Sequence, residues 1–261
     1  MLHTALDRVP ARPTGIRTSR LLAVVAKNAA ATDSCSSCCR KSVCLPSGIA
    51  VQDVSALDQL MTVKRRVTRG SVIYRCSDRF EAIYAVRSGA FKNVGVSTKG
   101  EEKITGFYFP GEVLGLDAIN SGRHPFNGIA LEDSEVCVIR FARLQEIALQ
   151  IPALQHHVFR LISRDISRDQ GLMLLLGSMN AEQRLAAFLL SLSRRYQRMG
   201  YAADRFNLRM TREDIGSYLG LTLETVSRFL SRFVRRGLIA ARQREIEIKD
   251  AEALLEIVGC W

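Results

Sequence analysis

The spacing of hydrophobic residues changes once along this chain of 261 residues, near Phe141. Before that point, short β-branched and aromatic runs, such as residues 82–86 and 136–139, are separated by turn residues such as Pro110 and Gly111. Strands and turns at this spacing indicate an antiparallel sandwich or barrel rather than alternating β/α units. Beyond Phe141 the spacing is helical. The sequence therefore predicts an N-terminal β domain followed by a helical part.

A long helix is expected to begin at Pro152, because proline is accommodated in the first turn of a helix but not in its interior. Over residues 159–176, apolar side chains recur at alternating steps of three and four, with one carboxylate, Asp169, in the series. That spacing is typical of a coiled-coil seam. Two interpretations remain open. Either the helix pairs with a second copy, or it packs on its own domain and Asp169 reaches solvent.

The C-terminal part carries the pattern of a helix-turn-helix followed by a wing. Thr211 and Asp214 predict a capping box at the start of one helix, and Gly220 predicts its end. Thr222 can cap the next helix, which Gly237 ends. Charged and apolar residues alternate after it, as in a short hairpin. Two helices joined by so tight a turn indicate DNA binding.

The charge of the chain agrees with that interpretation. The formal net charge is +11, and residues 205–244 contain nine arginines against three acidic residues. On the second helix of the motif, Glu224 can accept a hydrogen bond from a cytosine amine, and Arg228 can pair with guanine. The alternative is an ordinary surface helix with a solvated charged face. The caps, the turn glycine and the wing together favour DNA reading.

The seven cysteines are unevenly distributed, and four of them fall within ten residues. The full set is Cys35, Cys38, Cys39, Cys44, Cys76, Cys137 and Cys260. In a reducing compartment such a group indicates metal binding or redox chemistry rather than disulfides. Adjacent cysteines make poor ligands of one small site, so we expect one of the four to be a bystander and a distant cysteine to complete the set. Zinc and iron–sulfur remain equal alternatives at this point.

Several function classes are disfavoured. The apolar stretch at residues 21–26 is shorter than the roughly 7–15 residues of a secretory signal, and no run approaches the roughly 18 residues of a membrane span. We therefore expect a flexible N-terminal tail, a cytoplasmic protein and no membrane partner. No phosphate loop, nucleophile elbow or paired-carboxylate cleft is present, so an enzyme is not expected. The adjacent His156 and His157 are expected to be ordinary surface residues.

Taken together, these motifs resemble the CRP/FNR family of transcription regulators, and within it the oxygen-responsive FNR branch. The resemblance runs from about Cys35 to Val258. The family motif is C-x2-C-x5-C with a fourth cysteine after 92 residues, and it is matched by Cys35, Cys38, Cys44 and Cys137. Further similar segments are residues 104–107, 115–119, 166–176, 181–188 and 223–228.

The resemblance implies an α+β fold. It comprises an N-terminal antiparallel β-roll of the cyclic-nucleotide-binding type as sensor domain, a long dimerisation helix and a C-terminal winged helix-turn-helix domain. The corresponding ranges are a tail at 1–34, the cysteine-rich segment and β-roll at 35–151, the dimerisation helix at 152–178 and the DNA-binding domain at 179–261. The implied cofactor is a [4Fe–4S] cluster that promotes a homodimer. Oxygen would convert it to [2Fe–2S], weaken the dimer and inactivate a regulator, mainly an activator, of anaerobic-metabolism genes.

The same resemblance implies roles for individual residues. The base-reading set is Glu224, Ser227 and Arg228, and the dimerisation set is Ile166, Asp169 and Met173. The implied DNA site is a TTGAT-like inverted repeat in double-stranded DNA, and the loop around Gly100 is expected to contact RNA polymerase.

The sequence also departs from the family at two places. Cyclic-AMP-binding relatives carry an Arg-Ser pair for the phosphate, whereas residues 124–128 here read His-Pro-Phe-Asn-Gly, so no cyclic nucleotide is expected. Cys39, inside the cysteine motif, is unusual. Two alternatives therefore stay open: a thiol- or zinc-based redox-sensing CRP-type regulator without an iron–sulfur cluster, and a cyclic-nucleotide-binding regulator.

Overall fold

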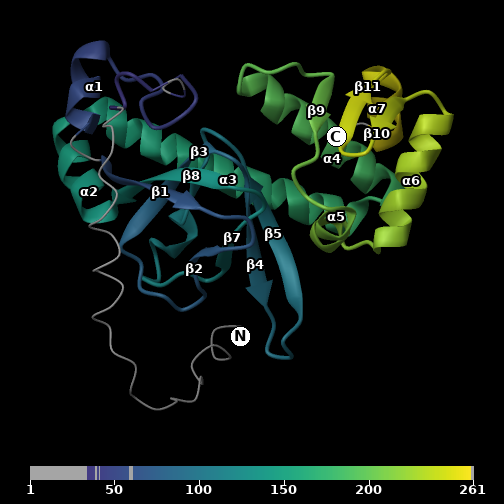
Figure 1. Ribbon diagram of the computed structural model, residues 1–261, viewed down its shortest axis with the longest axis horizontal. Helices are drawn as coiled ribbons and strands as arrows, with labels where there is room; N and C mark the ends of the chain where they lie inside the picture. Colours follow the sequence, from purple (N-terminus) through teal and green to yellow (C-terminus); the bar gives the residue numbers. More distant parts are fainter. Residues whose placement is uncertain (1–33, 39, 41, 59–60, 260–261) are drawn as a thin grey trace. The chain divides into compact units, whose positions relative to one another are not determined.

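The computed structural model describes residues 34–38, 40, 42–58 and 61–259 (Figure 1). The tail expected at 1–34 lies almost entirely outside this range, as do Cys39 and Cys260. The helices are α1 (Val51–Asp58), α2 (Phe141–Gln150), α3 (Pro152–Ser178), α4 (Ala181–Arg198), α5 (Arg212–Leu219), α6 (Leu223–Arg235) and α7 (Ala251–Val258), with a 3-10 turn at Leu116–Ala118. The strands are β1 (Met61–Val67), β2 (Val72–Tyr74), β3 (Ala82–Ser88), β4 (Phe91–Val96), β5 (Glu102–Tyr108), β6 (Val113–Leu114), β7 (Asn127–Ala130), β8 (Ser134–Arg140), β9 (Arg205–Asn207), β10 (Ile239–Arg242) and β11 (Glu245–Ile248).

The N-terminal β domain consists of two four-stranded antiparallel sheets, in the orders β1-β8-β3-β6 and β2-β7-β4-β5. Alternate side chains of both sheets meet in a common core that contains Ile73, Phe91, Leu114 and Val136. Strands with one buried face in this way account for the alternating sequence pattern. The expected antiparallel β-roll is thus confirmed.

A second apolar cluster covers the outer side of the first sheet. It joins Leu57 of α1, Leu144 of α2 and Leu154 of α3 to Ile83 and Cys137 of the sheet. Helix α3 begins at Pro152, and its N-terminal half packs in this cluster through residues up to Leu161. The cysteine-bearing segment and the start of the long helix therefore share one core.

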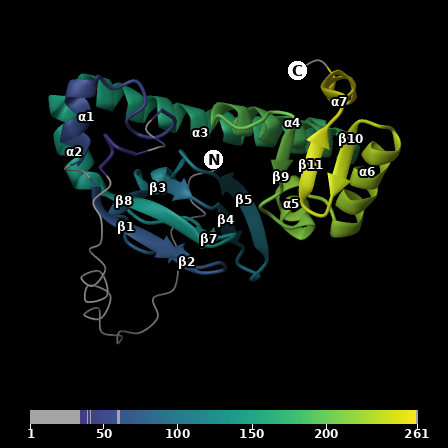
Figure 2. The same ribbon diagram turned by 45° about the horizontal axis from the view of Figure 1, so that its top comes forward.

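The C-terminal domain contains α4 to α7 and the three-stranded sheet β10-β11-β9 (Figure 2). The capping box is present, because the Thr211 hydroxyl accepts from the Asp214 amide at 3.0 Å and the Asp214 carboxylate accepts from the Thr211 amide at 2.8 Å. Gly220 ends α5 with φ 66°, a left-handed conformation that glycine adopts without strain. Thr222 caps α6 through the Thr225 amide. The helix-turn-helix and its wing are therefore confirmed.

The core of the C-terminal domain is continuous with side chains of the β-roll. Phe107 of β5 lies 5.1 Å from Tyr218 of α5 and 6.2 Å from Phe188 of α4, measured between ring centroids. Lys92 of β4 forms an ion pair with Asp214 at 2.7 Å. Apolar and charged contacts thus join α4 and α5 to the β4–β5 face.

Candidate functional site

Three of the four expected cysteine ligands lie on the loop before α1, and the fourth lies on a strand. Cys137 is 7% exposed and sits in the middle of β8, paired in register with Lys64 of β1. Cys35 and Cys44 are half-buried and pack against the apolar cluster to which Cys137 belongs. The structure thus brings the loop cysteines to the sheet strand that carries the fourth.

The four thiols influence one another electrostatically. Burial raises the pKa of Cys35 to about 12, and Cys137 and Cys38 add to that rise. Burial likewise raises the pKa of Cys44 to about 12, with contributions from the other three thiols, and that of Cys137 to about 11, with a contribution from Cys38. Such mutual effects require groups that lie near one another. Cys76, in contrast, is exposed on the turn after β2.

This donor set fits a metal centre in its chemistry. Four soft thiolates are what zinc and iron–sulfur clusters both require. As the side chains of the described residues lie, no three His, Cys, Asp or Glu groups are arranged to hold a metal ion.

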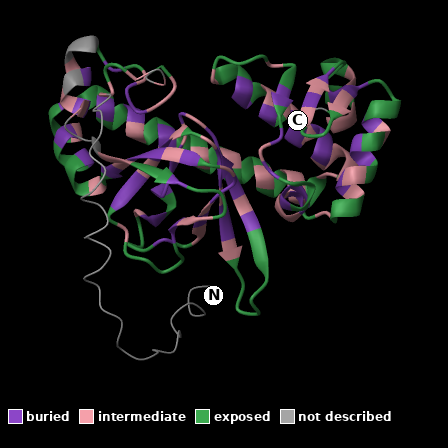
Figure 3. Cartoon of the chain, viewed as in Figure 1, coloured by how far each residue is buried: buried purple, intermediate pink, exposed green. Residues whose placement is uncertain are grey.

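The residues expected to read DNA bases lie on α6. Val226, Leu230 and Phe233 are buried, whereas Glu224 and Arg228 are exposed on the opposite side (Figure 3). Ser227, between them, is half-buried and accepts a hydrogen bond from Arg212 of α5 at 3.2 Å. Arg212 matches no sequence motif. An arginine in the first turn of α5, where acidic residues are favoured, is the local feature that sets this residue apart in the sequence.

The expected dimerisation residues are all exposed in the single chain. Ile166 is 52% and Met173 is 64% exposed, and Asp169 lies between them on α3. Phe159 and Leu174 of the same helix are also large, apolar and exposed. Exposed apolar residues along one helix are typical of a surface that meets a partner.

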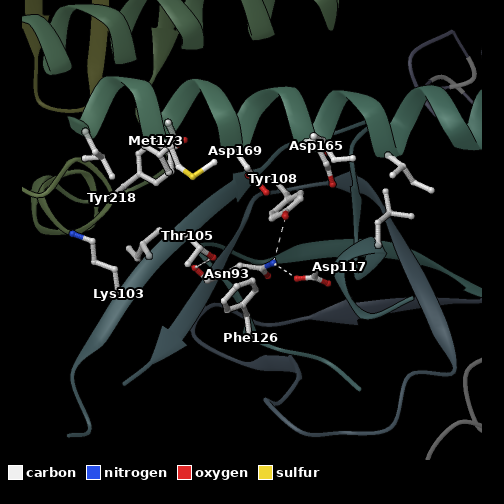
Figure 4. Close-up of a pocket in the computed structure, with 16 residues that line it drawn as sticks. Asn93, Lys103, Thr105, Tyr108, Asp117, Phe126, Asp165, Asp169, Met173 and Tyr218 are labelled. Carbon is white, nitrogen blue, oxygen red and sulfur yellow. Dashed lines mark hydrogen bonds between the residues drawn. The ribbon is translucent and has the colours of Figure 1, made fainter. Parts of the chain in front are cut away.

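A cavity of about 510 Å³ separates α3 from the β4–β5 sheet (Figure 4). Asp165 and Asp169 reach from α3 toward Tyr108, and Asp117 lies across the cavity. Asn93 connects the walls, since its amide donates to Asp117 at 3.3 Å and to the Tyr108 hydroxyl at 3.4 Å. Burial, with a contribution from the neighbouring Asp169, raises the pKa of Asp117 and of Asp165 to about 6. Three carboxylates in one cavity disfavour an anionic ligand.

The stretch at 124–128, where a phosphate clamp would be expected, is packed differently. His124 is buried, and its ring stacks on Tyr74 with centroids 3.9 Å apart. Burial lowers the pKa of His124, so the ring is favoured as neutral. This stretch therefore presents an uncharged aromatic stack where a nucleotide-binding relative places a cation.

A β-roll, a long helix with an exposed apolar face and a winged helix-turn-helix together define a DNA-binding regulator. The comparisons agree. Residues 64–150 match the cyclic nucleotide-binding domain, and residues 183–257 match the Crp-like helix-turn-helix domain. The chain belongs to the CRP/FNR family of transcription regulators, and it is not an enzyme.

Its similarity to individual relatives extends over most of the chain. It is 47% identical to the transcriptional regulatory protein btr of Bordetella pertussis, over 86% of this chain and 93% of that protein. It is 43% identical to the transcriptional activator protein Anr of Pseudomonas protegens and 40% to the fumarate and nitrate reduction regulatory protein of Escherichia coli, each over 86% of this chain and over 92% and 90% of those proteins. Among solved structures, FixK2 from Bradyrhizobium japonicum matches 76% of this chain and 98% of its own, with a TM-score of 0.70 and 29% identity. No helix among residues 34–38, 40, 42–58 and 61–259 is long and apolar enough to cross a membrane.

Proposed function

We propose that this protein is an oxygen-responsive regulator, mainly an activator, of genes for anaerobic metabolism. A [4Fe–4S] cluster would supply the oxygen-sensitive chemistry. The thiolates that would hold it are those of Cys35, Cys38, Cys44 and Cys137. The names of several relatives support this proposal, since they include an anaerobic regulatory protein and a fumarate and nitrate reduction regulatory protein. The observation that carries it is the packing of Cys35 and Cys44, from the loop, against the apolar cluster that contains Cys137 of the distant strand β8.

The shared apolar core offers a route from the cysteines to the dimer surface. Leu45, next to Cys44, packs in the same cluster as Cys137 and as Leu154 and Leu161 of α3. A movement of the cysteine-bearing loop toward Cys137 would displace the side chains of this apolar core, because protein cores are close-packed and transmit displacement. Helix α3 then moves with its exposed face, which carries Ile166. We propose that this movement favours pairing of α3 with its copy in a homodimer.

The DNA-binding domain would then read a TTGAT-like inverted repeat in the cytoplasm, one half-site per subunit. Glu224, Ser227 and Arg228 would contact bases in the major groove. The hairpin between β4 and β5, whose tip contains the exposed Gly100 with φ 82°, is the proposed contact for RNA polymerase.

Iron and acid-labile sulfide analysis of protein purified without air tests the proposal. We expect about four iron and four sulfide per chain, with loss of both after exposure to air. Stoichiometric zinc without sulfide, or free thiols without metal, would instead establish the alternative, a zinc- or thiol-based redox regulator of the same family.

Replacing Arg228 by alanine should weaken binding to the consensus site by about 5- to 150-fold for each half-site, because a bidentate arginine–guanine pair contributes about 1–3 kcal/mol of discrimination. Discrimination at the guanine should fall by a similar factor. Arg235→Ala is the matched control, since Arg235 is exposed at the C-terminal end of the same helix. It should weaken binding about equally on all sequences and reduce the salt slope by about one unit.

Binding isotherms recorded without air, on consensus and guanine-substituted sites at several salt concentrations, distinguish the two effects. If Arg228→Ala weakens both sites alike, Arg228 contacts phosphate, and the placement of α6 in the groove is wrong.

A further inference from the structure

A second cavity, of about 210 Å³, lies where four segments of the chain meet. Its walls are residues 42–47 of the cysteine-bearing loop, the turn at residues 110–112, helix α3 and helix α4. Arginine side chains dominate the lining, with Arg164 from α3 and Arg195 and Arg198 from α4. The cavity is thus a positively charged junction between the loop and the first helix of the DNA-binding domain.

Only one of these arginines is neutralised on the cavity wall. Arg195 is 7% exposed, and its Nε donates to Glu112 at 3.1 Å. Burial alone would raise the pKa of Glu112, but Arg195 and Arg168 bring it below its ordinary value, so this carboxylate stays ionised. Arg164 and Arg198 form no ion pair within the part of the chain that the structure describes. Burial and the neighbouring Arg164 and Arg195 lower the pKa of Arg198, whereas the carboxylate of Glu112 opposes that shift, and the net change is downward.

A buried histidine supplies a further donor. His157 lines the cavity and is 4% exposed, contrary to the expectation that it is an ordinary surface residue. Its Nδ1 lies 3.2 Å from Nη2 of Arg160. A guanidinium group only donates, so Nδ1 must accept, and the ring proton resides on Nε2. That Nε2 is buried and has no hydrogen-bond partner among the described residues.

The ring of His157 is also held neutral. Burial, with Arg160 and Arg164 nearby, lowers the pKa of His157 to about 4. A neutral ring at pH 7 offers one N–H donor and adds no charge. Buried donors without an acceptor are rare in proteins, because each one loses its hydrogen bond to water. An acceptor with negative charge would satisfy Nε2 and the two arginines at once.

We propose that this cavity binds a small tetrahedral oxyanion of the phosphate or sulfate class, through Arg164, Arg198 and the Nε2–H of His157. Guanidinium groups bind such anions through paired hydrogen bonds. The cavity is smaller than the roughly 300–1,000 Å³ of sites for larger ligands, which disfavours a nucleotide. The hydroxyl-bearing Ser42 and Ser47 also line it, so the anion would connect the cysteine-bearing loop with α3 and α4. This proposal stands independently of the iron–sulfur cluster.

Thermal unfolding of the full chain, purified without air, tests the site with inorganic phosphate as the probe. Phosphate at about ten times its Kd should raise Tm by about 3 °C relative to sodium chloride at the same ionic strength. The double variant Arg164→Gln/Arg198→Gln should lose this increment. Both arginines are exposed, so the variant is expected to fold. Arg75→Gln/Arg194→Gln removes the same charge from exposed arginines outside the cavity and should keep the increment.

The matched variants separate a specific site from the general stabilising effect of phosphate salts, which acts on all three proteins alike. Titration calorimetry should show one phosphate site per chain in the wild type and none in the Arg164/Arg198 variant. Sulfate should reproduce the increment, whereas acetate should not. Equal increments in the wild type and the Arg164/Arg198 variant, or no binding heat in the wild type, would overturn the proposal.

Discussion

Replacing Cys137 by serine should abolish the iron–sulfur cluster and, with it, DNA binding in the absence of air. Cys137 is the one proposed ligand on a strand, and no other described cysteine lies on the sheet that faces the loop. Serine oxygen is a harder donor than thiolate and does not replace it at such a cluster. The variant should therefore be colourless, contain little iron, and bind the consensus site only as weakly as cluster-free wild type.

The same loss is expected for Cys35→Ser, Cys38→Ser and Cys44→Ser. Cys76→Ser is the matched control, because Cys76 is exposed on the turn after β2, outside the apolar cluster that contains Cys137. It should keep the visible spectrum, the iron content and DNA affinity. Cys39 and Cys260 lie outside the described residues, and we expect a mild effect for Cys39→Ser and almost none for Cys260→Ser. A full [4Fe–4S] spectrum in Cys137→Ser would show that the ligand assignment is wrong.

Asp169→Ala should form dimers and bind DNA even in air. In a parallel pair of α3 helices, Asp169 would face its own copy, and two unit charges about 4 Å apart repel by about 4 kcal/mol at an effective dielectric of about 20. Asp165 and Asp117 line the same cavity as Asp169, so other carboxylates already lie near this position. Sedimentation of the aerobic variant at micromolar concentration measures the effect. Ser167→Ala, an exposed neighbour on α3, should remain monomeric like the wild type.

The acidity of this region also predicts how pH acts on the wild type. The pKa of Asp169 is raised by burial and lowered by Arg168, with a net rise, and a second copy would raise it further. The dimer then binds more protons than two monomers, so dimerisation of the cluster-free protein should strengthen as pH falls toward the raised pKa of Asp169. Arg168, which pairs with Asp165 at 3.0 Å, reduces but does not reverse this dependence. Asp169→Ala should show a much flatter dependence. A monomeric Asp169→Ala in air, or a wild type indifferent to pH, would contradict the switch.

The helix-turn-helix was predictable because its determinants are local. Thr211, Asp214, Gly220 and Thr222 each act within four residues of their own position, so the sequence contains the complete signal. The strands were only half predictable. Strand β4 carries Lys92, Asn93 and Gly95, which disfavour a strand when judged locally. Contacts from distant residues stabilise it, including the hydrogen bond from Tyr74 to Asn93 at 2.8 Å.

The candidate sites likewise have some parts that local sequence predicts and others that depend on contacts between distant residues. The spacing of Cys35, Cys38 and Cys44 is a local pattern, and Cys137 was assigned to it through the family resemblance. The positively charged cavity could not be predicted, because Arg164, Arg198 and Ser42 come from three separate segments. The sequence does not distinguish His157 from the adjacent His156. In the helix, consecutive side chains point in different directions, so His157 is buried and His156 is exposed. Only the packed structure distinguishes them.

Two aromatic side chains, from β5 and from the residue that follows it, belong to the C-terminal core and limit how this regulator can be recombined. A chimera joined between α3 and α4 would place a foreign DNA-binding domain against Phe107 and Phe109. The ring of Phe107 packs against Phe188 and Tyr218, and that of Phe109 packs against Tyr196. The smallest exchangeable module is therefore the recognition domain together with the β4–β5 surface that it covers, including the lysine that pairs with Asp214. Redirecting such a sensor to new promoters is accordingly better done by substitutions on α6 than by transplanting the whole domain.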